Sequence, residues 1–264
     1  MSIVIAFIIV GVLGLLLGLG LAIADKKLAI EKDEKLVALE EAMPGANCGG
    51  CGFAGCTAYA DAVYKGEAEP GLCSPGGAAL AAKMGEILGV KVEAKERMVA
   101  YVFCRGGKDV TKPDYEYKGM ADCNAAALLQ GGPNACKEGC LHLGSCISVC
   151  PAGAISKDSD GNIVVDKEAC IGCGKCTAVC PNHVIKLVPY NAEYIVACNN
   201  HEPGGKVRKI CQVGCIGCKI CQTKVPGSPF AVTDFLSVND YHAPQESAPA
   251  AAEACPQKCI IKRS

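Results

Sequence analysis

The chain has 264 residues, among them 21 Cys, no Trp and only 5% aromatic residues, and its 26 Lys and Arg nearly balance its 27 Asp and Glu. The length favours about two domains, and so few aromatic side chains argue against one large core anchored by Phe and Trp. The near-neutral charge excludes a nucleic-acid-binding function that depends on a net basic field. Small cysteine-rich modules are therefore expected.

The N-terminus begins with a run of 22 residues, 3–24, that carries no charged or strongly polar side chain. About 20 such residues suffice for a helix to cross a bilayer. Ala22-Ile23-Ala24 also fits the cleavage pattern of a signal peptide, but no Lys or Arg precedes the run and it is longer than a usual signal core. The sequence predicts a single transmembrane helix, with a cleaved signal as the alternative.

The residues after this run indicate where the cysteines lie. Lys26 and Lys27 follow the span directly, so the positive-inside rule places the remainder of the chain on the cytoplasmic side of the cell membrane. Thiols stay reduced there, and metal binding rather than disulfide formation becomes their expected use.

The organisation expected for the chain is that of a small multi-module iron–sulfur protein of the α+β class. A helix over residues 25–43 is expected to leave the membrane, a second helix to span Gly77–Leu88, a strand to span 90–93, and residues 242–254 to form a low-complexity loop. The predicted divisions are a transmembrane anchor (1–25), a helical stalk (26–45), a four-cysteine 4Fe-4S domain (46–100), a connecting segment (101–135), a two-cluster ferredoxin-like domain (136–190) and a degenerate ferredoxin-like domain with one cluster (191–264).

The strongest motif is Cys170-x2-Cys173-x2-Cys176-x3-Cys180-Pro181. In such a bacterial ferredoxin run, three thiolates hold one 4Fe-4S cluster and the fourth ligates the neighbouring cluster. A looser copy lies upstream, and crossing the fourth ligands predicts one cluster on Cys136, Cys140, Cys146 and Cys180 and another on Cys170, Cys173, Cys176 and Cys150. Zinc also binds Cys-x2-Cys pairs and is the alternative metal.

A third copy of the motif is incomplete. Cys-Pro pairs at 150, 180 and 255 each precede an Ile four residues after the Pro, which marks an internal repeat. In the last copy Val225 replaces the trailing cysteine and no complete second loop follows. Both losses affect one cluster, so a single cluster is predicted on Cys215, Cys218, Cys221 and Cys255. Cys259 stands where Ala154 and Val184 stand in the other copies, and is expected to be a core thiol.

The remaining cysteines are spaced differently. Cys48, Cys51, Cys56 and Cys73 are separated partly by glycines, which allow the backbone to approach cluster sulfurs; zinc is again the alternative. Four more, Cys104, Cys123, Cys198 and Cys211, either share a fifth site or are incidental thiols. At least four 4Fe-4S clusters are thus expected, and five if these four cysteines hold one. Basic residues around the third loop form either a solvated surface or a docking patch for an acidic redox partner, namely Lys206, Arg208, Lys209, Lys219 and Lys224.

The order of these features resembles a known family. The apolar span, the Asn-Cys-Gly-Gly-Cys-Gly-Phe-Ala-Gly-Cys segment at 47–56 and the ferredoxin-type repeats are similar, over nearly the whole chain, to the B subunits of Rnf membrane complexes. The resemblance implies an electron-transfer subunit that accepts electrons from reduced soluble ferredoxin. It also implies other subunits of the complex as partners, which couple transfer to NAD⁺ or another acceptor to Na⁺ or H⁺ translocation.

The residues themselves offer no acid, base or nucleophile constellation and no nucleotide-binding signature. The chain is therefore expected to carry electrons, with any chemistry on NAD⁺ performed by another subunit. Two alternatives use the same residues: a membrane-tethered polyferredoxin that feeds a different oxidoreductase such as a hydrogenase, and a non-redox metal-site scaffold or sensor.

Overall fold

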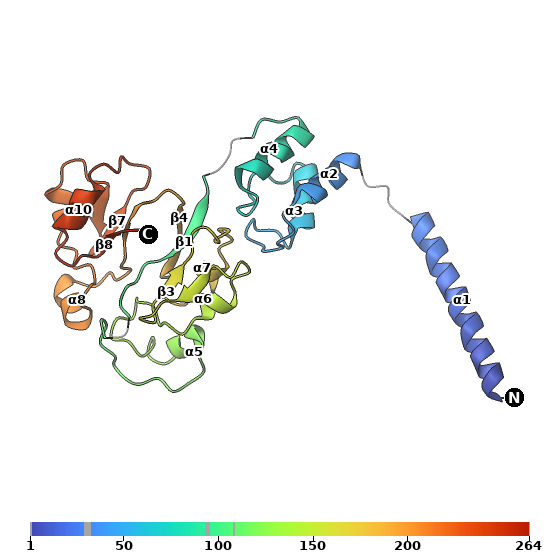
Figure 1. Cartoon of the computed structure of the whole chain (residues 1–264), viewed down its shortest axis with the longest axis horizontal. Helices are drawn as coiled ribbons and strands as arrows, with labels where there is room; N and C mark the ends of the chain where they lie inside the picture. Colours follow the sequence, from blue (N-terminus) through green and yellow to red (C-terminus); the bar gives the residue numbers. More distant parts are fainter. Residues whose placement is uncertain (1, 29–32, 93–95, 108, 264) are drawn as a thin grey trace.

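The structure is a computed structural model that describes residues 2–28, 33–92, 96–107 and 109–263; in the N-terminal helix it describes the side chains of residues 5 and 7–23. Four bodies follow one another in chain order: a long helix, a small helical domain, a ferredoxin-like unit and a C-terminal unit (Figure 1). Short helices alternate with antiparallel two-stranded sheets, which confirms a mixed α+β organisation.

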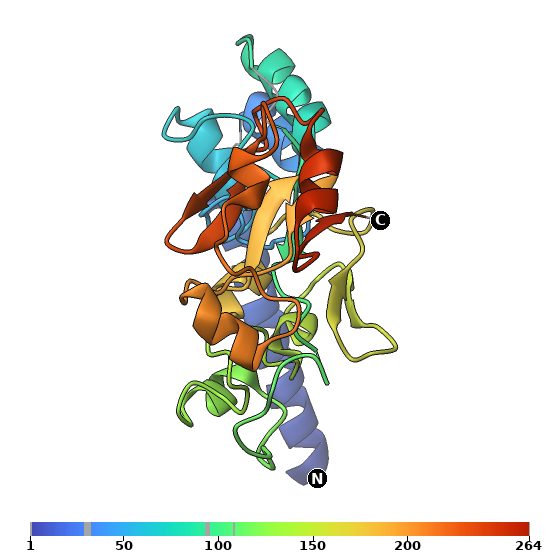
Figure 2. The same cartoon turned by 90° about the vertical axis from the view of Figure 1, so that its left-hand side faces the viewer.

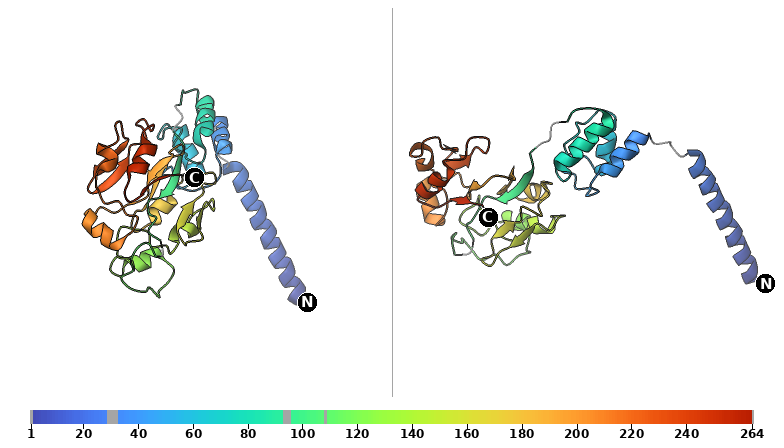
Figure 3. Two further views of the ribbon diagram at one scale, coloured as in Figure 1. Left: turned by 60° about the vertical axis from the view of Figure 1, so that its left-hand side comes forward. Right: turned by 45° about the horizontal axis from the view of Figure 1, so that its top comes forward.

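The N-terminal helix α1 (Ser2–Leu28) extends away from the rest of the molecule (Figure 3). Its apolar side chains are exposed, with Phe7 at 78% and Leu21 at 72%. Within the side chains described, no helical stretch is both long and apolar enough to cross a membrane. The flanking side chains of Lys26 and Lys27 lie outside the described residues.

The helix expected over residues 25–43 is divided. Residues 25–28 belong to α1, and α2 (Glu34–Ala42) is a separate helix whose first turn is capped by the Asp33 carboxylate, which accepts a hydrogen bond from the Lys35 N–H at 2.8 Å. Residues 29–32 lie outside the described part of the chain. The Asp33 cap starts a new helix because its side chain supplies a partner for one of the unpaired N–H groups of the first turn.

The helical domain consists of α2, α3 (Cys56–Tyr64) and α4 (Gly77–Leu88) around a core in which Leu39, Tyr59 and Met84 are fully buried. The buried Tyr59 hydroxyl donates to the Glu69 carbonyl at 2.8 Å and accepts from the Leu72 N–H at 3.0 Å. The helix predicted at Gly77–Leu88 is confirmed.

The strand predicted at 90–93 is wrong for the residues described. Gly89 ends α4 in the left-handed conformation (φ 72°), and the N–H of Val90 turns back to the Gly85 carbonyl at 2.9 Å. The Val92 side chain lies against Gly85, where an added Cβ would be 2.9 Å from its methyl group. The alternating pattern therefore closes the helix end instead of pairing in a sheet.

The ferredoxin-like unit is built on two antiparallel strand pairs. β1 (Met98–Val102) pairs with β4 (Ile185–Pro189), and β2 (Ile155–Lys157) pairs with β3 (Ile163–Val165). Three short helices carry cysteines between these strands: α5 (Cys123–Ala127), α6 (Ser145–Ser148) and α7 (Lys175–Val179). Aliphatic side chains of both sheets and several cysteines share one core.

The C-terminal unit repeats this plan at the end opposite α1, where it faces the viewer in Figure 2. β5 (Tyr194–Val196) pairs with β8 (Ile260–Lys262), and β6 (Phe230–Thr233) pairs with β7 (Leu236–Asn239). The unit also contains α8 (Gly204–Ile210), α9 (Ile220–Thr223) and α10 (Ala248–Ala254). The loop predicted at 242–254 is confirmed over 242–247 and wrong over 248–254, which α10 occupies. The Ala-rich sequence of α10 favours a helix, and Pro is tolerated in the first turn where it stands.

Candidate metal centres

All 21 cysteines fall into five groups in space. Group A lines one pocket in the helical domain, and groups B and C lie in the ferredoxin-like unit. Group D lies where this unit meets the C-terminal unit, and group E lies within the C-terminal unit. The members are Cys48, Cys51, Cys56 and Cys73 (A); Cys123, Cys140, Cys146 and Cys180 (B); Cys150, Cys170, Cys173 and Cys176 (C); Cys104, Cys136, Cys198 and Cys211 (D); and Cys215, Cys218, Cys221 and Cys255 with Cys259 (E).

Group A is formed by the loop before α3 and by the segment that leads to α4. The loop is tied by Asn47, whose side-chain oxygen accepts the N–H of Cys56 at 2.8 Å. Gly49 and Gly52 adopt positive φ angles of 73° and 89°, a conformation that glycine takes without strain. These turns bring the three loop thiols and Cys73 around one pocket.

Group C contains the four cysteines that the crossing rule assigns to one cluster. The sulfur of Cys170 accepts a hydrogen bond from the backbone N–H of Ala100 in β1 at 3.4 Å. Burial raises the pKa of Cys176, and the nearby thiols of Cys170, Cys173 and Cys150, together with Cys146 of group B, raise it further.

Group B differs from the set predicted by spacing. The structure brings Cys140, Cys146 and Cys180 together, but the fourth cysteine beside them is Cys123 rather than Cys136. Cys123 begins α5, and its N–H donates to the Ser145 hydroxyl at 2.7 Å, which in turn donates to Asp122 at 2.9 Å. This pair of bonds fixes α5 against α6. No cysteine stands between Cys140 and Cys146 in the sequence. Cys123, from a distant segment, supplies the thiol that this loop lacks.

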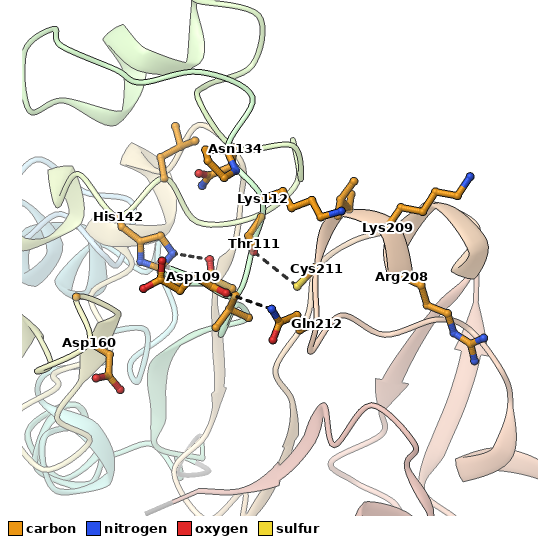
Figure 4. Close-up of a pocket in the computed structure, with 17 residues that line it drawn as sticks. Asp109, Thr111, Lys112, Asn134, His142, Asp160, Arg208, Lys209, Cys211 and Gln212 are labelled. Atoms are coloured by element: carbon orange, nitrogen blue, oxygen red, sulfur yellow. Dashed lines mark hydrogen bonds between the residues drawn. The ribbon is translucent and has the colours of Figure 1, made fainter.

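Cys136, the residue displaced from that set, lies in group D. There it meets Cys104, Cys198 and Cys211, three of the cysteines that no motif had placed. A cavity of about 590 Å³ opens beside the group (Figure 4). The view shows Thr111 across from Cys211, and its hydroxyl lies 3.6 Å from the Cys211 sulfur.

Group E contains five thiols. Cys255 and Cys259 both line the pocket of the Cys215 loop, and their sulfurs are 3.5 Å apart. Hydrogen bonding by Cys259 lowers the pKa of Cys215 and of Cys255, whereas the same contacts raise the pKa of Cys259. Cys259 thus retains its proton while its two neighbours favour the thiolate, the form that binds metal.

Several buried thiols in these groups are held neutral in the metal-free chain. Burial raises the pKa of Cys104 and Cys146 to about 11 and that of Cys176 and Cys198 to about 12. Metal binding at these sites must release the thiol protons.

The donor sets fit iron–sulfur clusters. Each group supplies at least four thiols, and soft thiolate ligands suit iron–sulfur clusters and zinc. Backbone N–H groups also point at sulfurs, as Gly106 does to Cys104 (3.4 Å) and His142 to Cys140 (3.4 Å); such bonds help to set cluster potentials. In the residues described, no three or more His, Cys, Asp or Glu side chains are grouped to hold a metal ion. A cluster, unlike a single ion, spreads its four ligands over several irons, so that its thiols stand farther apart.

Two family models match the chain. Residues 43–75 match the FeS model, described as an Fe-S cluster, and residues 132–191 match the LdpA Fe-S cluster-binding domain. The first match covers group A, and the second covers most of groups B and C. Iron–sulfur cluster binding is therefore supported for both parts of the chain.

Three curated proteins are similar over most of their length. The B subunit of the proton-translocating ferredoxin:NAD⁺ oxidoreductase complex of Clostridium ljungdahlii is 41% identical, with 90% of this chain and 84% of that protein aligned. The B subunit of an ion-translocating oxidoreductase complex of Methanosarcina acetivorans is 38% identical, with 95% of each chain aligned. The B subunit of the Na⁺-translocating ferredoxin:NAD⁺ oxidoreductase complex of Acetobacterium woodii is 38% identical over 96% of this chain and 75% of that protein.

Proposed function

The chain belongs to the family of B subunits of Rnf-type ion-translocating oxidoreductase complexes, and from this premise we propose that it receives electrons from reduced soluble ferredoxin and relays them to the membrane subunits of such a complex. Within that complex it works together with the other subunits. The downstream acceptor is NAD⁺ or another carrier, and transfer to it is coupled to Na⁺ or H⁺ movement by those partners.

The chain's contribution is a series of all-thiol sites. A 4Fe-4S cluster, when bound, accepts and releases one electron at a time at a potential set by its surroundings. Groups A, B, C and E each supply four cysteines for one cluster, and Cys259 lies beside group E without being needed as a ligand. Burial of the sulfurs excludes water from the sites. Hydrogen bonds to the sulfurs, such as that from the Ala100 N–H to Cys170 (3.4 Å), tune the reduction potential of a bound cluster.

The observation that carries the direction of transfer is the exposure of group E. Among all 21 cysteines, only Cys218 is exposed. Lys219 and Lys224, close to it in sequence, are also exposed, as are three further basic residues of the unit, Lys206, Arg208 and Lys209. Lys206 forms an ion pair with Glu202, which leaves the others to attract an acidic partner. We therefore assign the C-terminal unit as the entry point for ferredoxin, because complementary charge raises encounter rates.

The exit lies at the other end of the molecule. The helical domain with group A stands between α1 and the ferredoxin-like unit (Figure 1), so it is the cluster domain nearest to the N-terminal helix in the chain. We propose that residues 3–24 anchor the protein as a single span, with the iron–sulfur domains on the cytoplasmic side. The uninterrupted apolar sequence and the exposed side chains of α1 support this.

The test uses the full chain, purified without oxygen in detergent. Its iron and zinc contents are measured together with the EPR spectrum after reduction by ferredoxin. The proposal expects at least about 16 irons per chain, the number that groups A, B, C and E supply together, little zinc, and cluster signals that appear on adding reduced ferredoxin. Zinc in place of iron, or clusters that ferredoxin does not reduce, would contradict it.

A further inference from the structure

Group D joins four cysteines that lie far apart in the sequence. Cys104 and Cys136 come from the ferredoxin-like unit, whereas Cys198 and Cys211 come from the C-terminal unit. The thiols are close together: a Cβ added to Gly139 would lie 3.3 Å from the Cys136 sulfur and 3.6 Å from that of Cys104. One added to Gly106 would lie 3.5 Å from the Cys104 sulfur and 3.6 Å from that of Cys211.

Two members of group D, Cys104 and Cys198, occupy equivalent positions in the two units. Cys104 follows β1 and Cys198 follows β5, and each donates its N–H to the residue two positions earlier at 2.9 Å. Each sulfur then accepts the N–H of the residue two positions later, Gly106 at 3.4 Å and Asn200 at 3.5 Å. The same local turn therefore presents one thiol from each unit.

The other two members are also equivalent. The sequence Cys-x2-Gly-Cys occurs at 136–140 and again at 211–215, directly before the first cluster loop of each unit. Both intervening glycines lie against the leading thiol: a Cβ on Gly214 would be 3.6 Å from the Cys211 sulfur, as one on Gly139 would be 3.3 Å from that of Cys136. Each unit thus contributes the same half-site of two cysteines.

The two half-sites exchange hydrogen bonds across the boundary. Asn200 of the C-terminal unit donates its side-chain N–H to the Cys136 sulfur at 3.1 Å. Thr111 of the ferredoxin-like unit donates its hydroxyl to the Cys211 sulfur at 3.6 Å (Figure 4). The backbones are tied at the same place, where the Lys112 N–H donates to the Ile210 carbonyl at 2.9 Å.

We propose that group D is a fifth 4Fe-4S site, shared equally by the two units through Cys104, Cys136, Cys198 and Cys211, and that Cys123 takes the place of Cys136 in group B. The inference deepens the proposed function and rests on it. The four thiols converge, and each of their sulfurs accepts a hydrogen bond, the one at Cys211 from Thr111. Such surroundings are expected of a cluster. Two of the thiols, Cys136 and Cys198, are only 8% exposed.

The location explains why the site is useful. Gly139, the residue before Cys140 of group B, lines the pockets of both group B and group D. Gly214, the residue before Cys215 of group E, lies against the Cys211 sulfur of group D. Group D therefore lies directly between groups B and E. With it, the sites run from E through D, B and C to A without a gap.

The test counts clusters in cysteine variants of the full chain. The wild type is expected to bind about 20 irons, and Cys198→Ala and Cys136→Ala about 16 each. The double variant Cys136→Ala/Cys198→Ala should also bind about 16, because both changes empty one site, whereas Cys123→Ala/Cys198→Ala should fall to about 12. Gly205→Ala, in the same unit, is the control, because a Cβ there meets nothing within 4 Å, and should keep about 20 irons.

Partial occupancy is detected by a second measurement. If a site keeps three irons after losing one thiolate, the EPR spectrum of the oxidised protein gains a three-iron signal; Cys136→Ala and Cys198→Ala should change the same cluster signal. About 16 irons in the wild type would overturn the fifth site. So would a Cys136→Ala/Cys198→Ala variant with about four irons fewer than each single variant, or a loss of zinc on Cys198→Ala. Ferredoxin that fails to reduce a wild type with about 20 irons would instead contradict the proposed function.

Discussion

Gly50 of the four-cysteine loop lies directly against the backbone of Cys173, and a Cβ added to it would be 2.7 Å from the Cys173 carbonyl oxygen. The contact joins the loop of group A to the loop of group C. Gly172, the residue before Cys173, is equally confined, because a Cβ there would lie 2.4 Å from the carbonyl oxygen of Met98. The absence of side chains at this point lets two cluster loops from different domains touch.

Gly50→Ala should separate these loops. Overpacking of a tight contact typically costs about 1–3 kcal/mol, and the loops can relieve it by moving apart. We expect unchanged iron content but several-fold slower electron transfer from the ferredoxin-like unit to group A, measured by rapid mixing with reduced ferredoxin. Gly205→Ala is the control, because a Cβ there meets nothing within 4 Å. Equal rates in both variants would show that the contact does not set the transfer rate.

Asn200→Ala should lower the reduction potential of the cluster in group D. The Asn200 amide donates to the Cys136 sulfur, and such a bond stabilises the more negative reduced state. A net worth of about 0.5–1.5 kcal/mol corresponds to roughly 20–60 mV for one electron. A redox titration followed by EPR measures the shift. Asn134→Ala serves as the control, because that amide donates to the backbone carbonyl of Cys140 rather than to a sulfur; a similar shift in both would exclude the assigned bond as the cause.

Cys255→Ala should remove the cluster of group E, whereas Cys259→Ala should not. Cys255 is the cysteine of a Cys-Pro pair, as are Cys150 and Cys180, while Cys259 takes the place of Val184 in the repeat. The loss should be about four irons, or about three if one iron alone dissociates. The iron contents of the two variants are measured side by side. Equal losses of iron would mean that the Cys-Pro position does not identify the ligand.

Lys219→Glu/Lys224→Glu should weaken the encounter with ferredoxin. Both side chains are exposed beside group E, and reversing two charges on a docking surface reduces association by about tenfold at low salt. The rate of ferredoxin oxidation as a function of its concentration should show a raised KM and a smaller dependence on ionic strength. Lys83→Glu, an exposed lysine of α4 in the helical domain, should leave both unchanged. An unchanged KM in the double variant would show that ferredoxin docks on another surface.

Local motifs predicted the structure well where their geometry depends on near neighbours. The helix at Gly77–Leu88 was predicted from its Ala-rich sequence and is confirmed, and the loops of groups A, C and E follow from their tight spacing. The strand expected at 90–93 failed for the opposite reason, as did the part of the expected loop at 248–254. In both, a short pattern was interpreted without the helix that it closes or forms.

The grouping of cysteines between units could not be predicted from spacing. Cys104 and Cys198 become equivalent only when β1 and β5 are seen to pair with β4 and β8, which is a tertiary relationship. One signal was nevertheless present: the repeated Cys-x2-Gly-Cys at 136 and 211. It separates Cys136 from the ferredoxin loop that follows and matches it to Cys211.

The shared site also has a consequence for synthesis. In the residues that the structure describes, the sheets of each unit are two-stranded. Such sheets are marginally stable alone, and metal binding is coupled to folding in such small domains. Cys104 and Cys136 leave the ribosome well before Cys198 and Cys211, so half of group D must wait, reduced and metal-free, for the other half. A chain interrupted before residue 211 could not close that site, and its completion therefore marks a chain translated at least as far as Cys211.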